Sequence, residues 1–273
     1  TAAAHARGWV VAKGGTQRIV DALVADIVAH GGKIETNTRV SSVNDLPSHD
    51  VLMLDVVPSI ALEILGDRLP SRIARAYRSF SHGPGAFKVD FAVEDGIPWM
   101  AQDARRAGTV HVGGSFDEIA ANERSVVDGK MPAAPFVLVG QQYLADPSRS
   151  AGNVHPIWAY AHVPHGYTGD ATEAIVEQIE RFAPGFRDRV VGMAVRSTTE
   201  MSKYNENYVG GDIIGGAGSP LQTVFRPRVS PNPYATGIPG VYLCSSSTPP
   251  GAGAHGMCGA NAADRALTQR VVR

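Results

Sequence analysis

The chain has 273 residues, enough for one large domain or two modest ones. Its 25 basic and 26 acidic side chains give a formal net charge of −1, which argues against a nucleic-acid partner or an acidic membrane surface. Apolar residues make up 44% and charged residues 19%, which predicts a globular core rather than disorder.

Two cysteines, Cys244 and Cys258, are too few for a disulfide scaffold or a four-cysteine zinc site. They suit a reducing compartment, and we expect a cytoplasmic protein in which both are small buried hydrophobic residues. The longest apolar stretch is interrupted by charged residues and proline, so no transmembrane segment is expected. The opening residues do not read as a signal peptide, and we expect the natural chain to begin upstream of Thr1.

The first part of the chain is expected to alternate helices and strands. Thr16 can cap a helix whose apolar residues recur at helical spacing until Gly31 ends it. The elements predicted after it are strands at 34–43 and 50–57 and helices at 58–65 and 71–80.

The middle of the chain predicts an α+β segment with a mainly antiparallel sheet. Apolar residues alternate with polar ones from Phe87 to Glu94, as in a half-buried strand. Further strands are predicted at 135–143, 155–163 and 189–197. Two helices between the strands are predicted from capping boxes, which pair Ser115 with Glu118 and Asp170 with Glu173.

The last part is rich in glycine and proline, and residues 210–220 and 226–240 are predicted to be loops and turns. A strand is expected at 240–247, and a helix from about Gly256 to the end. The turn between them, Gly251–Gly256, fits the pattern G-x-G-x-x-G. Backbone N–H groups at such a helix start favour negative charge, so the turn is either a cofactor site or a tight strand–helix joint.

This turn cannot open a standard dinucleotide-binding unit. Too few residues follow Gly256 for the second strand of such a unit, and Asp264 is the one acidic residue among them. The turn therefore reads as the closing half of a site whose opening half is absent. Ser245–Ser247 do not form a hydrolase elbow, and Asp45, Asp50 and Asp55 read as solvated or turn carboxylates.

Several long segments resemble the C-terminal half of phytoene-desaturase-like FAD-dependent oxidoreductases, relatives of the flavin amine oxidases. The segment 240–267, GVYLCSSSTPPGAGAHGMCGANAADRAL, resembles the signature that ends these enzymes, and 13–40 resembles their glycine–helix–glycine–strand segment. The segments 87–99, 136–149 and 180–190 resemble the desaturase-like subgroup. The resemblance covers nearly all of the chain in the expected order.

The resemblance implies an α/β plus α+β fold. An incomplete, Rossmann-like FAD-binding domain of glutathione-reductase type, lacking its N-terminal βαβ unit, would comprise residues 8–75 and 205–273. Residues 76–204 would form the substrate domain on the antiparallel sheet. The missing N-terminal segment, or a partner chain, would supply the rest of the FAD site.

The resemblance also implies which residues would contact FAD. In the family, the glycine-rich turn lies against the flavin ring, where helix N–H groups would stabilise the charge of reduced flavin. The residues expected at the cofactor are Gly14, Gly15, Val40, Gly251, Gly253, His255, Gly256, Met257 and Cys258. Alternatively, Val40 is an ordinary sheet residue, Gly14 and Gly15 form a turn, and His255 orients the glycine-rich turn or borders the substrate cavity. No catalytic side chain is expected.

Trp158, Tyr160 and His162 project from one face of a predicted strand. They would line a substrate cavity or form an aromatic core layer. His162 and His165 have no evident third ligand, so no metal site is expected.

The function implied is transfer of hydride from a substrate C–H or C–N bond to flavin N5, on a small apolar or amine-type molecule. The alternative is a non-catalytic interaction or oligomerisation module that binds no flavin by itself. Loss of half a Rossmann domain would expose an apolar face, so a homo-oligomer is an expectation. An NAD-dependent dehydrogenase using residues 251–256 is a third interpretation, against which the missing second strand argues.

Overall fold

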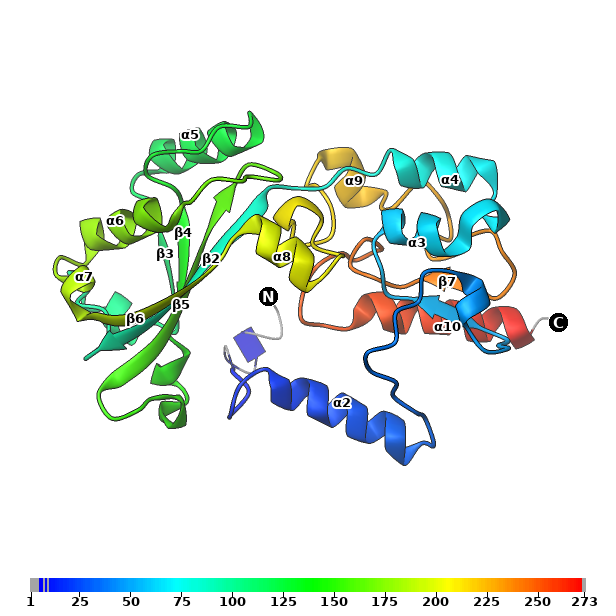
Figure 1. Cartoon of the computed structure of the whole chain (residues 1–273), viewed down its shortest axis with the longest axis horizontal. Coiled ribbons are helices and arrows are strands. Elements are labelled where there is room, and N and C mark those ends of the chain that lie inside the picture. Colours follow the sequence, from blue (N-terminus) through cyan, green and yellow to red (C-terminus); the bar gives the residue numbers. More distant parts are fainter. Residues whose placement is uncertain (1–4, 7, 9, 272–273) are drawn as a thin grey trace. The chain divides into compact units, whose positions relative to one another are not determined.

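The computed structural model describes residues 5–6, 8 and 10–271, and the chain divides into two compact units (Figure 1). The first unit comprises Thr1–Thr38, Phe87–Val163 and Gly169–Ser197. The second comprises Arg39–Ala86, Pro164–Thr168 and Thr198–Arg273. The prediction about the opening residues falls in part on 1–4, 7 and 9, which lie outside the described residues.

The first unit is built on a five-stranded antiparallel sheet, as the alternating patterns predict. Its strand order is β3-β4-β5-β2-β6. The strands are β2 (Gly85–Glu94), β3 (Thr109–Val112), β4 (Val137–Gly140), β5 (Val154–Val163) and β6 (Val190–Arg196). The sequence pattern misses β3, because a four-residue strand is too short for its alternation to stand out.

One face of this sheet is packed and the other is only half covered. Helix α6 (Thr172–Phe182) contacts β3, β4 and β5, and its Ile175 and Ile179 are fully buried. Along β5 the side chains of Ile157, Ala159, Ala161 and Val163 are buried, whereas those between them are half-buried. This alternation is the pattern expected of a sheet with a packed face and a more open face.

The two predicted capping boxes have different outcomes. Helix α5 (Phe116–Val127) begins with a box in which Ser115 accepts from the Glu118 N–H and Glu118 accepts from the Ser115 N–H. The box predicted at Asp170 and Glu173 is wrong: α6 has Ala171 as its N-cap. Asp170 instead accepts the N–H of Thr172 in a local turn.

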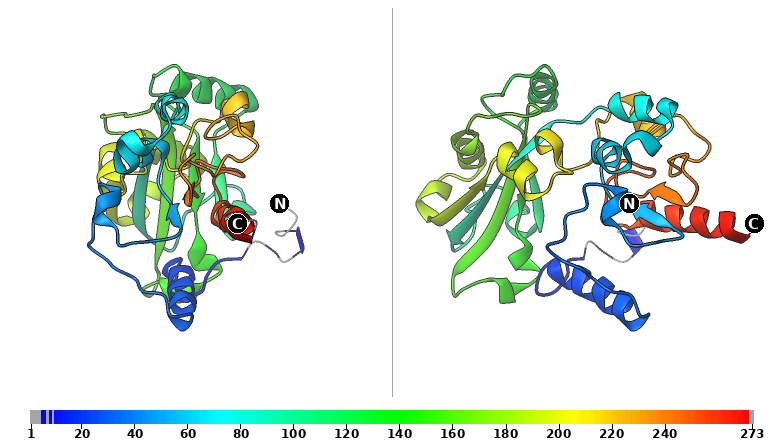
Figure 2. Two further views of the ribbon diagram at one scale, coloured as in Figure 1. Left: turned by 90° about the vertical axis from the view of Figure 1, so that its right-hand side faces the viewer. Right: turned by 45° about the vertical axis from the view of Figure 1, so that its right-hand side comes forward.

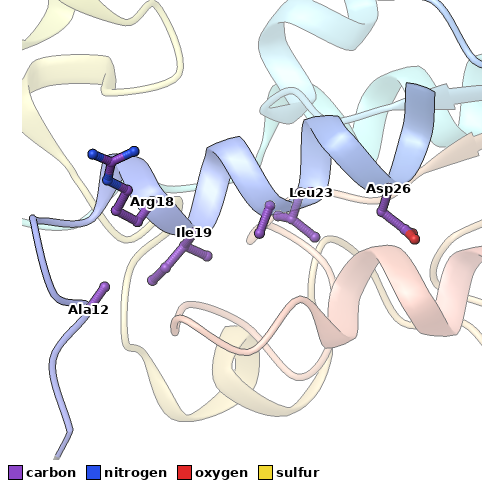
Figure 3. A pocket seen from close by; sticks show the side chains of 6 residues that line it. Ala12, Arg18, Ile19, Leu23 and Asp26 are labelled. Atoms are coloured by element: carbon purple, nitrogen blue, oxygen red, sulfur yellow. The ribbon is translucent and has the colours of Figure 1, made fainter. Parts of the chain in front are cut away.

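Helix α2 (Gln17–Ala29) is present as predicted, but Thr16 adopts helical dihedrals and makes no side-chain cap hydrogen bond. None of its residues is buried, although an apolar stripe runs along it. A groove of 460 Å³ lies along this stripe and is lined by Ala12, Arg18, Ile19, Ala22, Leu23 and Asp26. Figure 3 shows the side chains that line it.

The strand predicted at 34–43 is wrong. These residues form no ladder, and Asn37 takes a positive φ of 57° that interrupts an extended chain. A strand needs a neighbour for its backbone groups, and none of the described strands pairs with this segment. The segment instead leads into a short 3₁₀ helix, η1 (Val43–Asp45), whose capping box starts at Ser42.

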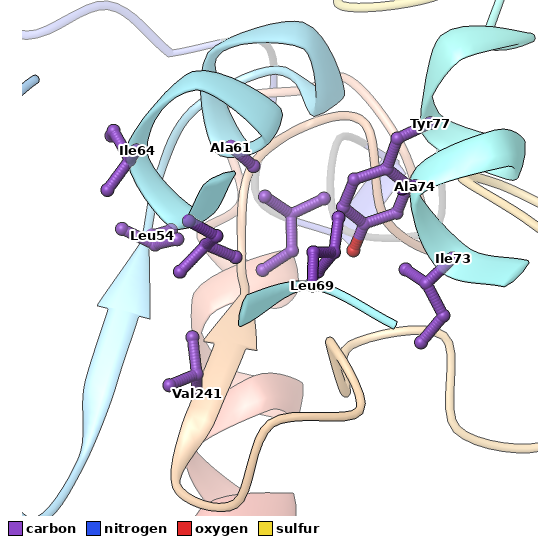
Figure 4. Packing of buried hydrophobic residues seen from close by; sticks show 10 residues of the cluster. Leu54, Ala61, Ile64, Leu69, Ile73, Ala74, Tyr77 and Val241 are labelled. Carbon is purple, nitrogen blue, oxygen red and sulfur yellow. The ribbon is translucent and has the colours of Figure 1, made fainter. Parts of the chain in front are cut away.

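The second unit has three layers around a pair of parallel strands, β1 (Leu52–Leu54) and β7 (Val241–Leu243). Helices α3 (Pro58–Leu65) and α4 (Ser71–Arg78) cover one face, where Leu54 and Leu243 join the apolar cluster shown in Figure 4. Helix α10 (Met257–Val271) covers the other face, where Tyr242 packs on Ala262 and Ala266. Figure 2 shows β7 and α10 side by side.

The remaining elements are short. They are α7 (Phe186–Arg189), α8 (Thr198–Tyr204), α9 (Pro220–Val224), η2 (Gly66–Arg68), η3 (Ala104–Arg106), η4 (Gln142–Leu144), η5 (Pro147–Arg149) and η6 (Val209–Gly211). Helix α9 and η6 lie in or beside the region predicted as loop. Across the described part of the chain, no helix combines the length and apolarity needed to cross a membrane.

Candidate cofactor site

The candidate site lies at the carboxyl end of the parallel strands of the second unit. In open α/β sheets, ligands bind in the crevice beyond these strand ends. Here β1 is followed by Asp55, and β7 by Cys244 and then by residues 245–248, of which Ser245, Ser247 and Thr248 are buried. This segment leads to the glycine-rich turn. Burial raises the pKa of the Cys244 thiol to about 12, and the charge of Asp55 adds to this effect.

The glycine-rich turn is exposed. Gly251 is buried, whereas residues 252–257 are exposed up to and including the first residue of α10. Gly251 and Gly253 have φ angles of 100° and 149°, which residues other than glycine rarely adopt. A Cβ on Gly251 would lie 3.0 Å from the guanidinium of Arg226, and one on Gly253 would lie 2.6 Å from the His255 ring. The turn therefore presents bare backbone to the surface at the start of a 15-residue helix.

Side chains of the turn itself contact the start of this helix. The Met257 N–H donates to Nδ1 of His255 at 3.0 Å, so the imidazole takes one of the free helix donors. The Cys258 thiol is buried and donates to the carbonyls of Thr248 (3.4 Å) and Gly251 (3.3 Å). His255 thus hydrogen-bonds to the first residue of α10, and Cys258 ties the helix to the segment that precedes it.

Arg226 supports the turn from the protein interior. Its side chain is 6% exposed, and its Nη1 donates to the Ser246 carbonyl at 2.9 Å. Burial lowers the pKa of its guanidinium, and the charge of Asp212 partly opposes this shift. A buried cation therefore lies beside the buried Gly251, where the exposed part of the turn begins.

The other predicted cofactor residues belong to other segments of the two units. Gly14 and Gly15 both have positive φ and belong to the first unit, where the Gly14 N–H donates to Asp146 at 2.7 Å. Val40 belongs to the second unit and packs, partly buried, against the apolar cluster beneath α3 and α4. Within the second unit, the residues that come together are those of the turn, Gly251–Cys258.

Trp158, Tyr160 and His162 share one half-covered face of β5. The Trp158 and Tyr160 rings stack with centroids 6.1 Å apart and planes 4° apart, and Tyr160 lies 5.8 Å from His162. The His162 Nδ1 lies 2.9 Å from a carboxylate oxygen of Glu123 on α5. Burial raises the pKa of the Tyr160 hydroxyl, and the charge of Glu123 adds to this effect.

Sequence reasoning missed Glu123 and two other members of this face. Phe136 stacks on His111 of β3 at 5.5 Å and lies 6.3 Å from His162. Alternation along β5 identifies which of its residues share a face. No local pattern in the sequence shows that residues from three other segments lie beside that face. Among the described residues, no group of three or more His, Cys, Asp or Glu side chains is arranged to hold a metal ion.

Comparisons with known proteins relate the chain to oxidoreductases. It is 22% identical over 293 residues to rat pyridine nucleotide-disulfide oxidoreductase domain-containing protein 2, covering 93% of this chain and 50% of the rat protein. The mouse protein of the same name is 34% identical over 92 residues, which cover 33% of this chain and 16% of that protein. No protein-family profile matches the chain.

The fold is similar to that of an oxidoreductase from Methanosarcina mazei, known from its crystal structure. The TM-score is 0.56 at 16% identity, over 90% of this chain and 53% of that one. The chain thus spans about half the length of the rat protein and of this solved structure. These similarities support a general relationship to oxidoreductases and do not single out the phytoene-desaturase-like group.

Proposed function

We propose that the chain is the C-terminal portion of an FAD-dependent oxidoreductase of the phytoene-desaturase-like group. In this proposal, residues 8–75 and 205–273 contribute to the FAD-binding domain and residues 76–204 form the substrate domain. The compact units of the structure differ from this division, because residues up to Thr38 group with the five-stranded sheet. The protein would work in a reducing compartment such as the cytoplasm.

One observation carries this proposal: the exposed glycine-rich turn at the start of α10, at the carboxyl end of β1 and β7. Had this helix start been sealed in an apolar core, the proposal would have failed. The residues present fit a flavin, because the exposed Gly253 and Gly256 carry no side chain and permit close approach of a planar ring. The helix start and buried Arg226 both favour the negative charge of a reduced flavin.

When bound, FAD would supply the acceptor for a hydride from a substrate C–H or C–N bond, and a second acceptor would reoxidise it. The residues of this chain would position the cofactor and the substrate and would stabilise the charge of the reduced flavin. Residues 251–258 would hold the ring, and Gly14, Gly15 and Val40 would contact other parts of the cofactor. The face formed by Trp158, Tyr160 and His162 would receive an apolar or amine-type substrate, with Glu123 able to attract a cation beside these rings.

A second candidate function rests on the exposed stripe of α2. Ile19, Leu23 and Ile27 are 52%, 61% and 44% exposed, which is unusual for one face of a helix. A non-catalytic module that binds a partner, or a second copy of the chain, through this stripe would explain the exposure without any cofactor.

Visible absorbance of the purified chain, read together with its intact mass, separates the two functions. A yellow protein that releases FAD on denaturation, or one that co-purifies with an N-terminal piece, supports the oxidoreductase. A colourless chain of 28.8 kDa that takes up no added FAD supports the module. Uptake of NAD without flavin would instead favour the NAD-dependent interpretation.

A further inference from the structure

Asp212 is a fully buried carboxylate in the second unit, 0% exposed. It accepts backbone N–H groups from Gly83 at 2.9 Å and from residues 214–216 at 2.8 to 3.1 Å. The imidazole Nδ1 of His82 lies 3.3 Å from one of its oxygens. Both carboxylate oxygens are therefore used, and the loop 214–216 is folded around them.

This carboxylate stays ionised in the folded protein. Burial alone would raise the pKa of Asp212, but hydrogen bonds from His82 and from the backbone of Gly83, Ile214 and Gly216 lower it below its usual value. An ionised acceptor holds several N–H groups more strongly than a neutral one. An asparagine would turn an NH₂ group toward some of these donors, so it would not replace the aspartate.

The loop around Asp212 contacts the segment that precedes the glycine-rich turn. The Ser247 hydroxyl, fully buried, donates to the Gly215 carbonyl at 2.9 Å. A Cβ on Gly215 would lie 2.2 Å from the Ser246 hydroxyl, so the two segments are in close contact. One residue beyond Ser247, the Thr248 carbonyl accepts from the Cys258 thiol at the start of α10.

We propose that Asp212 is a positioning residue for the glycine-rich turn, acting through the loop 214–216 and the Ser247 hydroxyl. Asp212 fixes the loop, the loop fixes Ser247, and the segment 245–248 fixes the start of the turn at Gly251. The consequence for FAD rests on the proposed function. The structural link between Asp212 and the turn does not depend on the proposed function.

The test compares Ser247→Ala with Thr236→Val. Both remove one buried hydroxyl that donates to a backbone carbonyl at 2.9 Å in the same unit. Ser247 leads to the turn, whereas Thr236 bonds to Val241 at the amino end of β7. Thr236→Val also removes the acceptor of the Ile238 N–H (3.3 Å), so its loss of global stability is expected to be at least as large as that of Ser247→Ala. A larger change at the turn in Ser247→Ala therefore isolates the link. Asp212→Asn is the third variant, and Ser247→Ala keeps the test valid should Asp212→Asn fail to fold.

Two readouts are made on each variant: amide hydrogen exchange at residues 251–258, and the dissociation constant for added FAD. We expect Ser247→Ala and Asp212→Asn to speed exchange in the turn and weaken FAD binding at least about tenfold. Thr236→Val should leave both unchanged. Equal exchange at the turn in Ser247→Ala and Thr236→Val would overturn the positioning role.

The outcomes separate this inference from the proposed function. Faster exchange at the turn in a protein whose wild type binds no FAD keeps the positioning role and counts against FAD binding by this chain alone. FAD binding that is the same in wild type, Ser247→Ala and Asp212→Asn keeps the flavin proposal and removes the positioning role.

Discussion

At the scale of single residues, the second unit depends on buried polar groups that reach across long sequence separations. Arg226 donates to the carbonyl of Ser246, 20 residues away, and Asp212 accepts from the N–H of Gly83, 129 residues away. A buried polar atom that loses its partner costs more than the bond itself contributed. These side chains are therefore the places where a single substitution should have the largest effect.

Arg226→Met keeps most of the side-chain volume but leaves the Ser246 carbonyl without its donor. We expect the free energy of unfolding to fall by about 1–3 kcal/mol, measured by urea denaturation. The matched control is Arg18→Met, at a side chain that is 69% exposed, which should change stability by less than about 0.5 kcal/mol. Equal effects of the two variants would show that Arg226 does not support this segment.

The two cysteines should resist thiol reagents in the folded protein. Thiolate is the reactive form, and the Cys244 pKa of about 12 leaves almost no thiolate at pH ~8. Cys258 is buried and already donates to two carbonyls. A colorimetric thiol titration should detect close to zero reactive thiols per chain without denaturant and two per chain in urea. Fast labelling of either cysteine in the native protein would contradict this account.

At the scale of elements, a helix start with a side-chain capping hydrogen bond should contribute more to stability than a helix start without one. Ser115 closes a capping box on α5, whereas Thr16 makes no cap bond on α2. Ser115→Ala should lower the free energy of unfolding by about 0.5–2 kcal/mol. Thr16→Ala should change it by less than about 0.5 kcal/mol, because no hydrogen bond is lost. Urea denaturation of both variants measures the difference, and a larger loss for Thr16→Ala would refute the assignment.

Local patterns predicted those elements whose periodicity decides their structure. The alternation in β2 and β5 and the helical spacing in α2 each give the observed element. The strand expected at 34–43 fails because a strand also needs a neighbour, which its own residues cannot supply. In the same way, the glycine spacing indicates the turn at 251–256. Arg226 lies beside this turn, and the loop around Asp212 contacts the segment before it, but no sequence pattern near either residue predicts these contacts.

At the scale of the whole molecule, the exposed stripe of α2 predicts self-association. Ile19 and Leu23 are more than half exposed on one helix face. The double variant Ile19→Glu/Leu23→Glu should remain folded and sediment as a monomer, because buried like charges oppose an apolar contact. Phe116→Glu, at an 81% exposed site on α5, should sediment as the wild type does. A wild type that is monomeric at all concentrations would remove the homo-oligomer expectation.

The most direct test of the central claim is a titration of FAD into three proteins: the wild type, Gly256→Ala and Gly166→Ala. The two glycines have φ angles of 64° and 67°, and a Cβ on either would meet nothing within 4 Å, so both variants carry similar backbone strain. If the turn at the start of α10 holds the flavin ring, Gly256→Ala should bind FAD at least about tenfold more weakly than the wild type and Gly166→Ala. Equal affinities in all three proteins would contradict the assignment.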